Sequence, residues 1–213
     1  MSQLPDLSQF LPQLLAGMVV NFQIAFIALV VGLVLGGLLC LLSLSGSFFK
    51  MIVSALVAAM RAAPAFIVMF FLFNAIPRGA AFAIGDLSIG LAPPPLMAVA
   101  LALVPYSMSY VVDNGIEAVM QLRRGSILGA LLFLPNITRA FFVLVMSSSA
   151  GAAIGVTEGV SVILRATAPM TSLADKLVLF AIGILCFGLT LQAGAFLMRV
   201  LQRRLGRIAA PSV

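Results

Sequence analysis

Long apolar stretches are the feature that most constrains this chain. Of its 213 residues, 63% are hydrophobic and only 8% are charged, whereas an ordinary soluble domain carries about 25% charged residues. So few charges cannot cover the surface of a globule in water. Apolar stretches of roughly 20 residues recur, the length that crosses a hydrocarbon core of about 30 Å. The sequence therefore predicts an all-α, polytopic protein that spans a lipid bilayer.

Five membrane spans are predicted within one transmembrane domain that covers residues 1–213. They lie at about residues 24–44, 51–76, 96–112, 127–146 and 177–198. Long loops follow the second and fourth spans, and the later loop is rich in small and polar residues. Many secondary transporters are built from paired repeats, whereas these five spans show no repeat. We therefore expect the chain to work as part of an oligomer.

Basic residues in the short loops predict the orientation. One side carries seven of them: Lys50, Arg123, Arg124, Arg199, Arg203, Arg204 and Arg207. The other side carries three: Arg78, Arg165 and Lys176. Because cytoplasmic loops carry the excess of Lys and Arg, the N-terminus is predicted outside, the C-terminus in the cytoplasm, and both long loops outside. The net charge of +6 is explained by topology, so no nucleic-acid partner is expected.

Several kinds of chemistry have no residues to carry them. The chain has no histidine, and its two cysteines, Cys40 and Cys186, lie within apolar runs where they fit as packing residues. It has no G-x4-G-K-S/T phosphate loop and no evident nucleophile–base pair. We therefore expect no catalytic residue, metal or cofactor in this chain. Any ATP and Mg²⁺ would be bound by a partner ATPase.

The second span contains a charge and a helix breaker close together, in the run RAAPAFIVMFFLFNAIP (residues 61–77). Arg61 lies eleven residues after Lys50, or about 16 Å along a helix. Pro64 lacks an N–H and disturbs the helix. One interpretation is a bent helix whose arginine faces a cavity or a partner. The other is that the preceding helix lies in the interface and Arg61 snorkels to headgroups.

This run resembles the Arg-Gly-Thr-Pro-Leu-Leu-Val-Gln-Leu-Phe-Phe segment of permease subunits of polar amino acid ABC importers. The matching positions are Arg61, Pro64, Val68, Phe70, Phe71 and Pro77. The run SSSAGAAIGVTEG (residues 147–159) is similar to a second motif of that family, with Ser149, Ile154, Gly155, Val156 and Glu158 in register. Leu134, Pro135 and Phe141 also match. The resemblance covers about residues 13–207.

The resemblance implies a division of labour in a bacterial cytoplasmic membrane. Two such permeases, identical or different, form the pathway. Two cytoplasmic ATP-binding subunits drive it, and an extracytoplasmic binding protein delivers a polar amino acid or a related small solute. The sequence does not identify the solute.

The segment at about residues 115–126 departs from the family, which has a longer cytoplasmic coupling helix there. The residues that echo it are Glu117, Ala118, Leu122, Arg123, Arg124 and Gly125, although Gly125 is out of register. Three interpretations stay open. The segment is a minimal coupling helix, or the partner permease carries most of the signal, or the two arginines mark topology alone. The short segment also leaves open a non-transporting assembly or scaffold subunit.

Polar residues within the spans are the candidate solute contacts. Arg139 is the strongest candidate, because its own hairpin offers it no obvious carboxylate. The alternative is an arginine that caps carbonyls near Pro135. The other candidates are Asn136, Thr138, Ser147, Ser148, Ser149 and Glu158, the last at the outer gate or facing the binding protein. Asp113 and Glu117 share a helical face and are expected to pair with Arg123 or Arg124. Arg61, Pro64 and Asp113 are assigned structural or gating roles.

Overall fold

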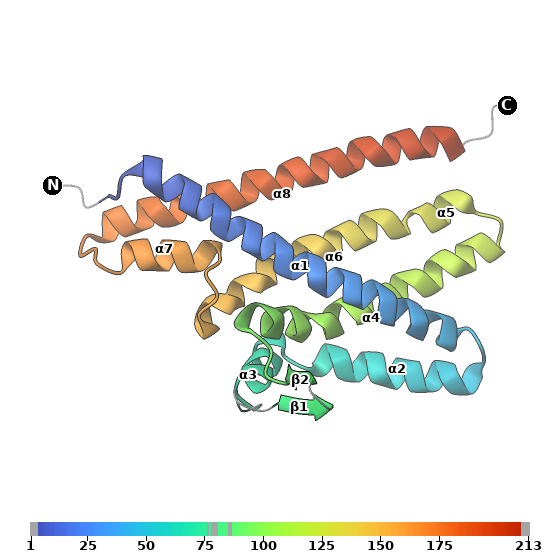
Figure 1. Ribbon diagram of the computed structural model, residues 1–213. Coiled ribbons are helices and arrows are strands. Elements are labelled where there is room, and N and C mark those ends of the chain that lie inside the picture. Colours follow the sequence, from blue (N-terminus) through green and yellow to red (C-terminus); the bar gives the residue numbers. More distant parts are fainter. Residues whose placement is uncertain (1–3, 76, 78–80, 85–86, 210–213) are drawn as a thin grey trace.

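The computed structural model describes residues 4–75, 77, 81–84 and 87–209, and Arg78 lies outside them. The chain folds into a bundle of long helices (Figure 1). Four helical segments are long and apolar enough to cross a membrane, or five if the bent pair α2 (Ser47–Ala62) and α3 (Ala65–Ala75) counts as one span. The prediction of an all-α protein is confirmed, and the five predicted spans are reached when the bent pair is counted as one span. The orientation remains a prediction.

The most extensive helix–helix contact of the bundle joins α1 (Leu7–Ser43) to α4 (Pro95–Arg123), which run side by side in the same direction. At about 1.5 Å per residue, the 37 residues of α1 reach roughly 56 Å, so α1 is much longer than one bilayer core. It begins well before the predicted span because Asp6 caps it, accepting a hydrogen bond from the Ser8 amide at 2.9 Å.

Small residues allow α1 and α4 to approach closely. A side chain on Gly32 would overlap Ser107, and a Cβ on Gly36 would lie 2.8 Å from the Met108 carbonyl. The sequence pattern Gly32-x3-Gly36 thus serves helix packing, as membrane helices commonly use it. Ser107 is fully buried at this seam, and its hydroxyl has no hydrogen-bond partner among the described residues.

The second predicted span is bent at Pro64, as in the first of the two interpretations of the Arg61–Pro64 run. Helices α2 and α3 meet at 84°. Ala63 is extended, with φ −76° and ψ 114°, because the ring of Pro64 disfavours the helical conformation in the residue before it. The polypeptide then enters α3, where the Val68 amide bonds to the Pro64 carbonyl at 3.1 Å.

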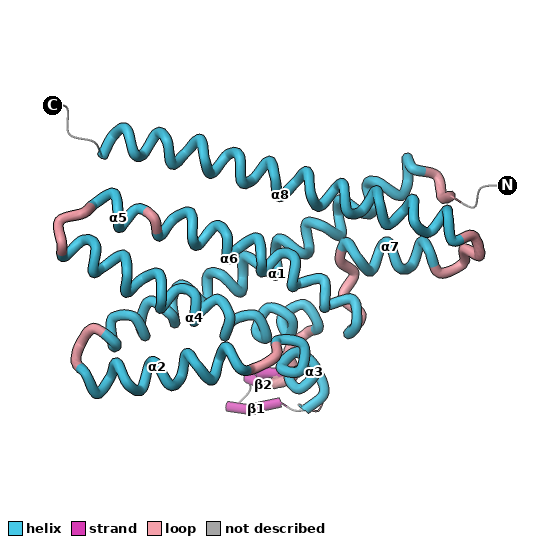
Figure 2. The backbone as a smooth tube through the Cα atoms, turned by 180° about the vertical axis from the view of Figure 1, so that it is seen from behind, coloured by secondary structure: helices cyan, strands magenta, loops and turns pink. Residues whose placement is uncertain are grey.

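The loop after α3 contains a two-stranded antiparallel hairpin that the sequence analysis does not anticipate. Strands β1 (Ala81–Ile84) and β2 (Leu87–Gly90) pair with Phe82 opposite Ile89. Figure 2 shows the hairpin beside α3, at the edge of the bundle. It is the only sheet in the described part of the chain.

The fourth predicted span is built from two helices, α5 (Ile127–Leu131) and α6 (Phe133–Ser147), and the 3₁₀ helix η1 (Ser148–Ile154) continues beyond its predicted end. Helix α5 ends at Leu131 because Pro135, four residues on, has no N–H to bond its carbonyl. Residues 147–176, expected as a loop, instead contain η1 and helix α7 (Gly159–Thr167). The last helix, α8 (Leu173–Ala209), packs on α6 and α7 along the outside of the bundle.

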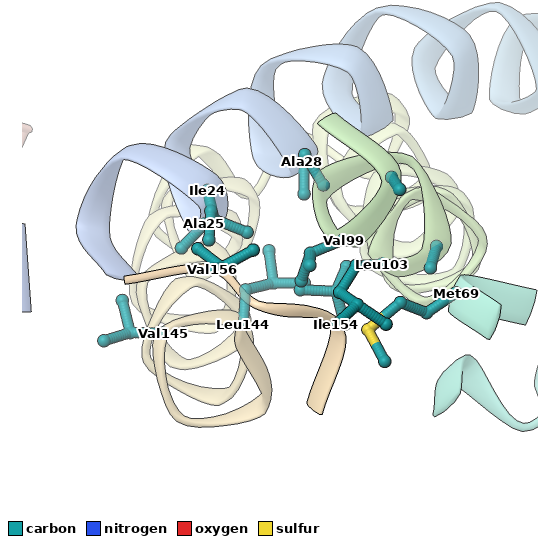
Figure 3. Packing of buried hydrophobic residues seen from close by; sticks show 13 residues of the cluster. Ile24, Ala25, Ala28, Met69, Val99, Leu103, Leu144, Val145, Ile154 and Val156 are labelled. Carbon is teal, nitrogen blue, oxygen red and sulfur yellow. The ribbon is translucent and has the colours of Figure 1, made fainter. Parts of the chain in front are cut away.

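The main apolar core lies where α1, α3, α4, α6 and η1 meet. Figure 3 shows Ile24 and Ala28 of α1 facing Val99 and Leu103 of α4, with Leu144 between them and Val156 close by. Met69 of α3 joins this cluster and is almost fully buried. The core therefore ties the short helix after the bend to the central pair α1 and α4.

Candidate functional site

An ion pair joins the bend in the second span to the middle of α4. Arg61, in the last turn of α2, contacts the Asp113 carboxylate through its guanidinium. About half of each side chain is exposed, 54% for Arg61 and 49% for Asp113. The expected pairing of Asp113 and Glu117 with Arg123 or Arg124 is therefore wrong. Helix α4 runs unbroken to Arg123, and Asp113 lies level with the end of α2. Glu117 instead accepts a hydrogen bond from the Gln121 side chain at 2.7 Å.

A groove of about 340 Å³ opens beside this ion pair. It is lined by Arg61 and Met60 at the end of α2, by Ala65 of α3, and by Pro105, Tyr106 and Tyr110 of α4. The two tyrosine rings lie with their centroids 6.0 Å apart and tilted by 32°. The groove thus combines a cation, two phenol groups and an apolar floor. No motif in the sequence marks the two tyrosines as site residues.

A buried polar network lies nearer the other end of α1. Asn21 of α1 donates to the Ser148 hydroxyl at 2.8 Å and to the Glu158 carboxyl at 3.0 Å, and its carbonyl oxygen accepts from the Gly159 amide at 3.0 Å. All three side chains are fully buried. The network therefore joins α1, η1 and α7 at one point.

Glu158 is also the N-cap of α7. Its carboxyl accepts from the amides of Val160 and Ser161, at 2.9 and 2.7 Å, and the Ser161 hydroxyl accepts from the Glu158 amide in return. This reciprocal arrangement satisfies amides that a helix start leaves without partners. Because Glu158 is fully buried, the structure does not place it at an exposed outer gate.

The remaining polar candidates of the fourth span have different partners. Asn136 donates to Asn114 of α4 at 2.6 Å, and the Thr138 hydroxyl donates to the Leu134 carbonyl within its own helix at 2.9 Å. Ser149 is a second, longer acceptor for Asn21, at 3.4 Å. Ser147 is exposed. The structure thus does not gather the predicted contacts into one cluster.

Arg139 lies in a groove of about 210 Å³ between α6 and α8. The walls include Pro135, Thr138 and a second arginine, Arg199. No acidic side chain lines this groove in the described part of the chain. The sequence predicts that Arg139 has no carboxylate partner in its own hairpin, and the lining of this groove agrees. Two guanidinium groups without a carboxylate attract an anion.

The predicted coupling segment forms the end of α4 and the turn after it, without a separate helix. Glu117, Ala118, Leu122 and Arg123 belong to the last turns of α4, and Arg124 is its C-cap. Gly125 has a φ of +78°, a conformation that glycine adopts without strain. Ser126 then caps α5, accepting from the Gly129 amide at 3.1 Å. Two exposed arginines therefore stand at a tight turn.

At the opposite end of the bundle, a larger groove of about 640 Å³ lies between the start of α1 and α7. Asp6 and Gln9 of α1 face Thr157 and Arg165 across it. The hydrogen bonds from the backbone and the side chain of Ser8 lower the pKa of Asp6 below its usual value. Arg165 donates to the Thr157 hydroxyl at 3.2 Å.

Among the described residues, no group of three or more His, Cys, Asp or Glu side chains is placed to hold a metal ion. No cofactor site is assigned.

No protein-family model matches this sequence, and no curated protein matches it. A solved structure does: a chain from the crystal structure of an amino acid ABC transporter with histidines, which superposes with a TM-score of 0.70 and 16% sequence identity. The match covers 93% of this chain and 96% of that chain. At this identity the likeness concerns the fold. The resemblance to amino acid ABC transporter permeases is therefore confirmed at the level of the fold.

Proposed function

We propose that this chain is the transmembrane permease subunit of an ABC importer that moves a polar amino acid or a related small solute. The observation that carries the proposal is the fold likeness, which extends over 93% of this chain and 96% of a chain from an amino acid ABC transporter. The sequence contains no phosphate-binding loop, so ATP and Mg²⁺ are assigned to a separate ATP-binding subunit. A bacterial cytoplasmic membrane, an extracytoplasmic binding protein and a second permease complete the proposal.

The half-exposed ion pair supports the need for a second subunit. A charged side chain facing hydrocarbon is costly, and intramembrane charges nearly always face protein or a water-filled cavity. Arg61 and Asp113 are both about half exposed in the single chain. The proposal therefore places the face formed by α2, α3 and α4 toward the pathway shared by two permeases.

Helix α4 offers a mechanical connection from the ATPase to that face. It is continuous from Pro95 to Arg123, and Tyr106 at the groove is 17 residues, or about 26 Å, from its cytoplasmic end. A displacement of the turn at Arg124 and Gly125 would move this helix as a rigid body. In this account Glu117 and Arg123, both exposed near the turn, contact the ATP-binding subunit.

A second candidate function rests on the shortness of that turn. Between α4 and α5 only Arg124, Gly125 and Ser126 are outside a helix. A scaffold subunit that keeps the permease fold without transmitting ATPase closure would tolerate such a turn. The short turn is equally compatible with transport if a different partner permease carries a longer coupling helix.

Co-purification tests the proposal. The tagged chain is extracted from its own membrane in mild detergent, and the proteins that accompany it are identified and quantified by mass spectrometry. A stoichiometric ATPase with a phosphate-binding loop is expected, together with a second permease. If the tagged chain purifies alone, or only with proteins that lack a nucleotide site, the result would favour the scaffold function.

A further inference from the structure

The groove of about 640 Å³ between the start of α1 and α7 holds two opposite charges that do not pair. Asp6 lies on the α1 side and Arg165 on the α7 side. In the part of the chain that the structure describes, no ion pair joins them: Asp6 accepts from the Ser8 amide, and Arg165 donates to the Thr157 hydroxyl. The Arg165 guanidinium has five donors, so most of them remain available to a ligand.

The α1 wall of this groove changes from polar to apolar along the helix. The residues that line it share one helical face, because they are spaced alternately three and four positions apart. Asp6, Gln9 and Gln13 make the first half polar, and then Ala16 and Val20 make the second half apolar. The distance from Asp6 to Val20 is about 21 Å along the helix. An amphiphile with a polar head and a hydrocarbon chain has the same order of polarity.

Helix α8 indicates where the groove lies relative to the bilayer. Its uncharged run at residues 177–198 is about 33 Å long, enough to cross a hydrocarbon core of about 30 Å, and it begins directly after Lys176. Leu179 packs in one buried cluster with Phe10 and Leu14 of α1, and Phe10 also lines the groove. Figure 1 shows the start of α1, α7 and the start of α8 at the same end of the bundle. The groove therefore lies at the boundary of the hydrocarbon core, on the side predicted to face outward.

Buried contacts hold the two walls of the groove in place. A Cβ on Gly17 would lie 2.9 Å from the carbonyl carbon of Glu158, so the backbone of α1 closely approaches the start of α7. About one turn farther along α1, Asn21 accepts a hydrogen bond from the Gly159 amide at 3.0 Å. The groove is thus formed between two fixed helices, and its volume is within the roughly 300–1,000 Å³ typical of ligand pockets.

We propose that this groove binds a phospholipid whose headgroup ends in a primary ammonium, such as phosphatidylethanolamine. The lipid phosphate pairs with Arg165, the ammonium donates to the side chains of Asp6 and Gln9, and the start of an acyl chain lies along Ala16 and Val20. The trimethylammonium of phosphatidylcholine has no N–H to donate. Phosphatidylglycerol has no cation for Asp6 and leaves a net negative charge beside it. This lipid site does not depend on the proposed transport function.

Native mass spectrometry tests the site on the full chain with the subunits that co-purify with it, after co-purified lipid is removed in mild detergent. Phosphatidylethanolamine, phosphatidylcholine and phosphatidylglycerol with identical acyl chains are titrated separately, and the Kd of the first bound lipid is measured. For the wild type we expect phosphatidylethanolamine to bind at least about ten-fold more tightly than either of the others, as for one charged hydrogen bond.

A soluble headgroup distinguishes a lipid from a water-soluble ligand. Glycerophosphoethanolamine carries the same phosphate and ammonium without acyl chains, so it should not displace phosphatidylethanolamine at equal concentration. Displacement at equal concentration would assign the groove to a soluble zwitterion and overturn the lipid site.

Two variants separate the two ends of the headgroup. Asp6→Asn keeps an N-cap for α1 but removes the carboxylate, so the Kd of phosphatidylethanolamine should rise about ten-fold, to that of phosphatidylcholine, which should change little. Arg165→Gln should raise the Kd of both lipids about ten-fold and keep the preference, whereas Arg165→Lys, which keeps the charge, should restore most of the binding. An equal loss for all three lipids in Asp6→Asn would show a structural role for Asp6 and overturn the site.

Lys176→Gln is the matched control, because it removes a positive charge from the same end of the bundle without changing the lining of the groove. It should keep the wild-type Kd values. A loss as large as that of Arg165→Gln would show general attraction of lipids to basic residues and overturn the site. Unchanged binding of phosphatidylethanolamine by both Asp6→Asn and Arg165→Gln would also overturn it, and would leave the groove to a partner protein.

Discussion

Replacement of Asn21 by alanine should destabilise the protein strongly, although Asn21 is a single uncharged residue of α1. Its side chain makes three hydrogen bonds of 3.0 Å or shorter that hold α1 to η1 and α7. Ser148 and Glu158, its partners, are fully buried. Asn21→Ala would leave the Gly159 amide without its acceptor and the Glu158 carboxyl with one donor fewer.

The expected loss can be worked from these contacts. Hydrogen bonds between membrane helices average about 0.6 kcal/mol, so three contribute roughly 2 kcal/mol. The buried Gly159 amide left without a partner adds about 1–3 kcal/mol. The free energy of unfolding should therefore fall by roughly 3–5 kcal/mol. For a chain of this size that lowers the Tm by roughly 10 °C.

The chain contains its own reporter for this measurement. Cys40 is buried and Cys186 is half-buried, so a maleimide dye that fluoresces on reaction with thiols follows unfolding in detergent. Asn114→Ala is the matched control, because it removes one interhelical hydrogen bond, from Asn136 at 2.6 Å, and should cost about 1 kcal/mol or less. Equal Tm losses for the two variants would refute the assignment of the Asn21 network as a buried tether.

Three further predictions concern separate parts of the molecule. Arg139→Ala should remove uptake of carboxylate-bearing solutes while Arg139→Lys retains part of it; normal uptake by the alanine variant would remove Arg139 from the pathway and leave its groove to lipid phosphates. The double variant Glu117→Gln/Arg123→Gln should lose solute-stimulated ATP hydrolysis in a complex that still assembles, and full stimulation would exclude the coupling role. Gly32→Ala should lower the Tm by overlap with Ser107, and Ser107→Gly in the same chain should restore it; no restoration would show that the close approach of α1 and α4 is not the cause.

The bend in the second span is predictable from the sequence because its cause is local. Pro64 constrains Ala63 directly, and the 84° angle between α2 and α3 follows at that point. The end of α5 before Pro135 has a local cause of the same kind. Strand pairing in β1 and β2 was missed because four-residue strands give a weak pattern in an apolar loop.

The partners of Asp113 and Asn21 were missed because they are distant in the sequence. Asp113 has nearer arginines along the chain, yet the fold brings Arg61 to it. The sequence does carry a signal for this pair: Arg61 lies about 16 Å from Lys50 and Asp113 about 15 Å from Arg123, and both basic residues lie on the same predicted side. Asn21 offers no such signal, since its partners lie 127 to 138 residues away.

Glu158 shows how the surroundings of a residue can be misjudged from the sequence. Its place after a span predicted a polar, exposed position at the outer gate. The structure buries it completely, since it caps α7 and accepts from Asn21 at the same time. The pattern Glu158-x2-Ser161 at a helix start is the local signal that would have indicated a cap.

ATP-driven uptake is the most direct test of the central claim that this chain is an ABC importer permease. The chain, with the ATPase and any second permease that co-purify, is reconstituted in liposomes with the binding protein and a radiolabelled amino acid. The account predicts accumulation that requires ATP and is lost when the catalytic glutamate of the partner ATPase is replaced. ATP hydrolysis by an assembled complex without accumulation of any amino acid would contradict it.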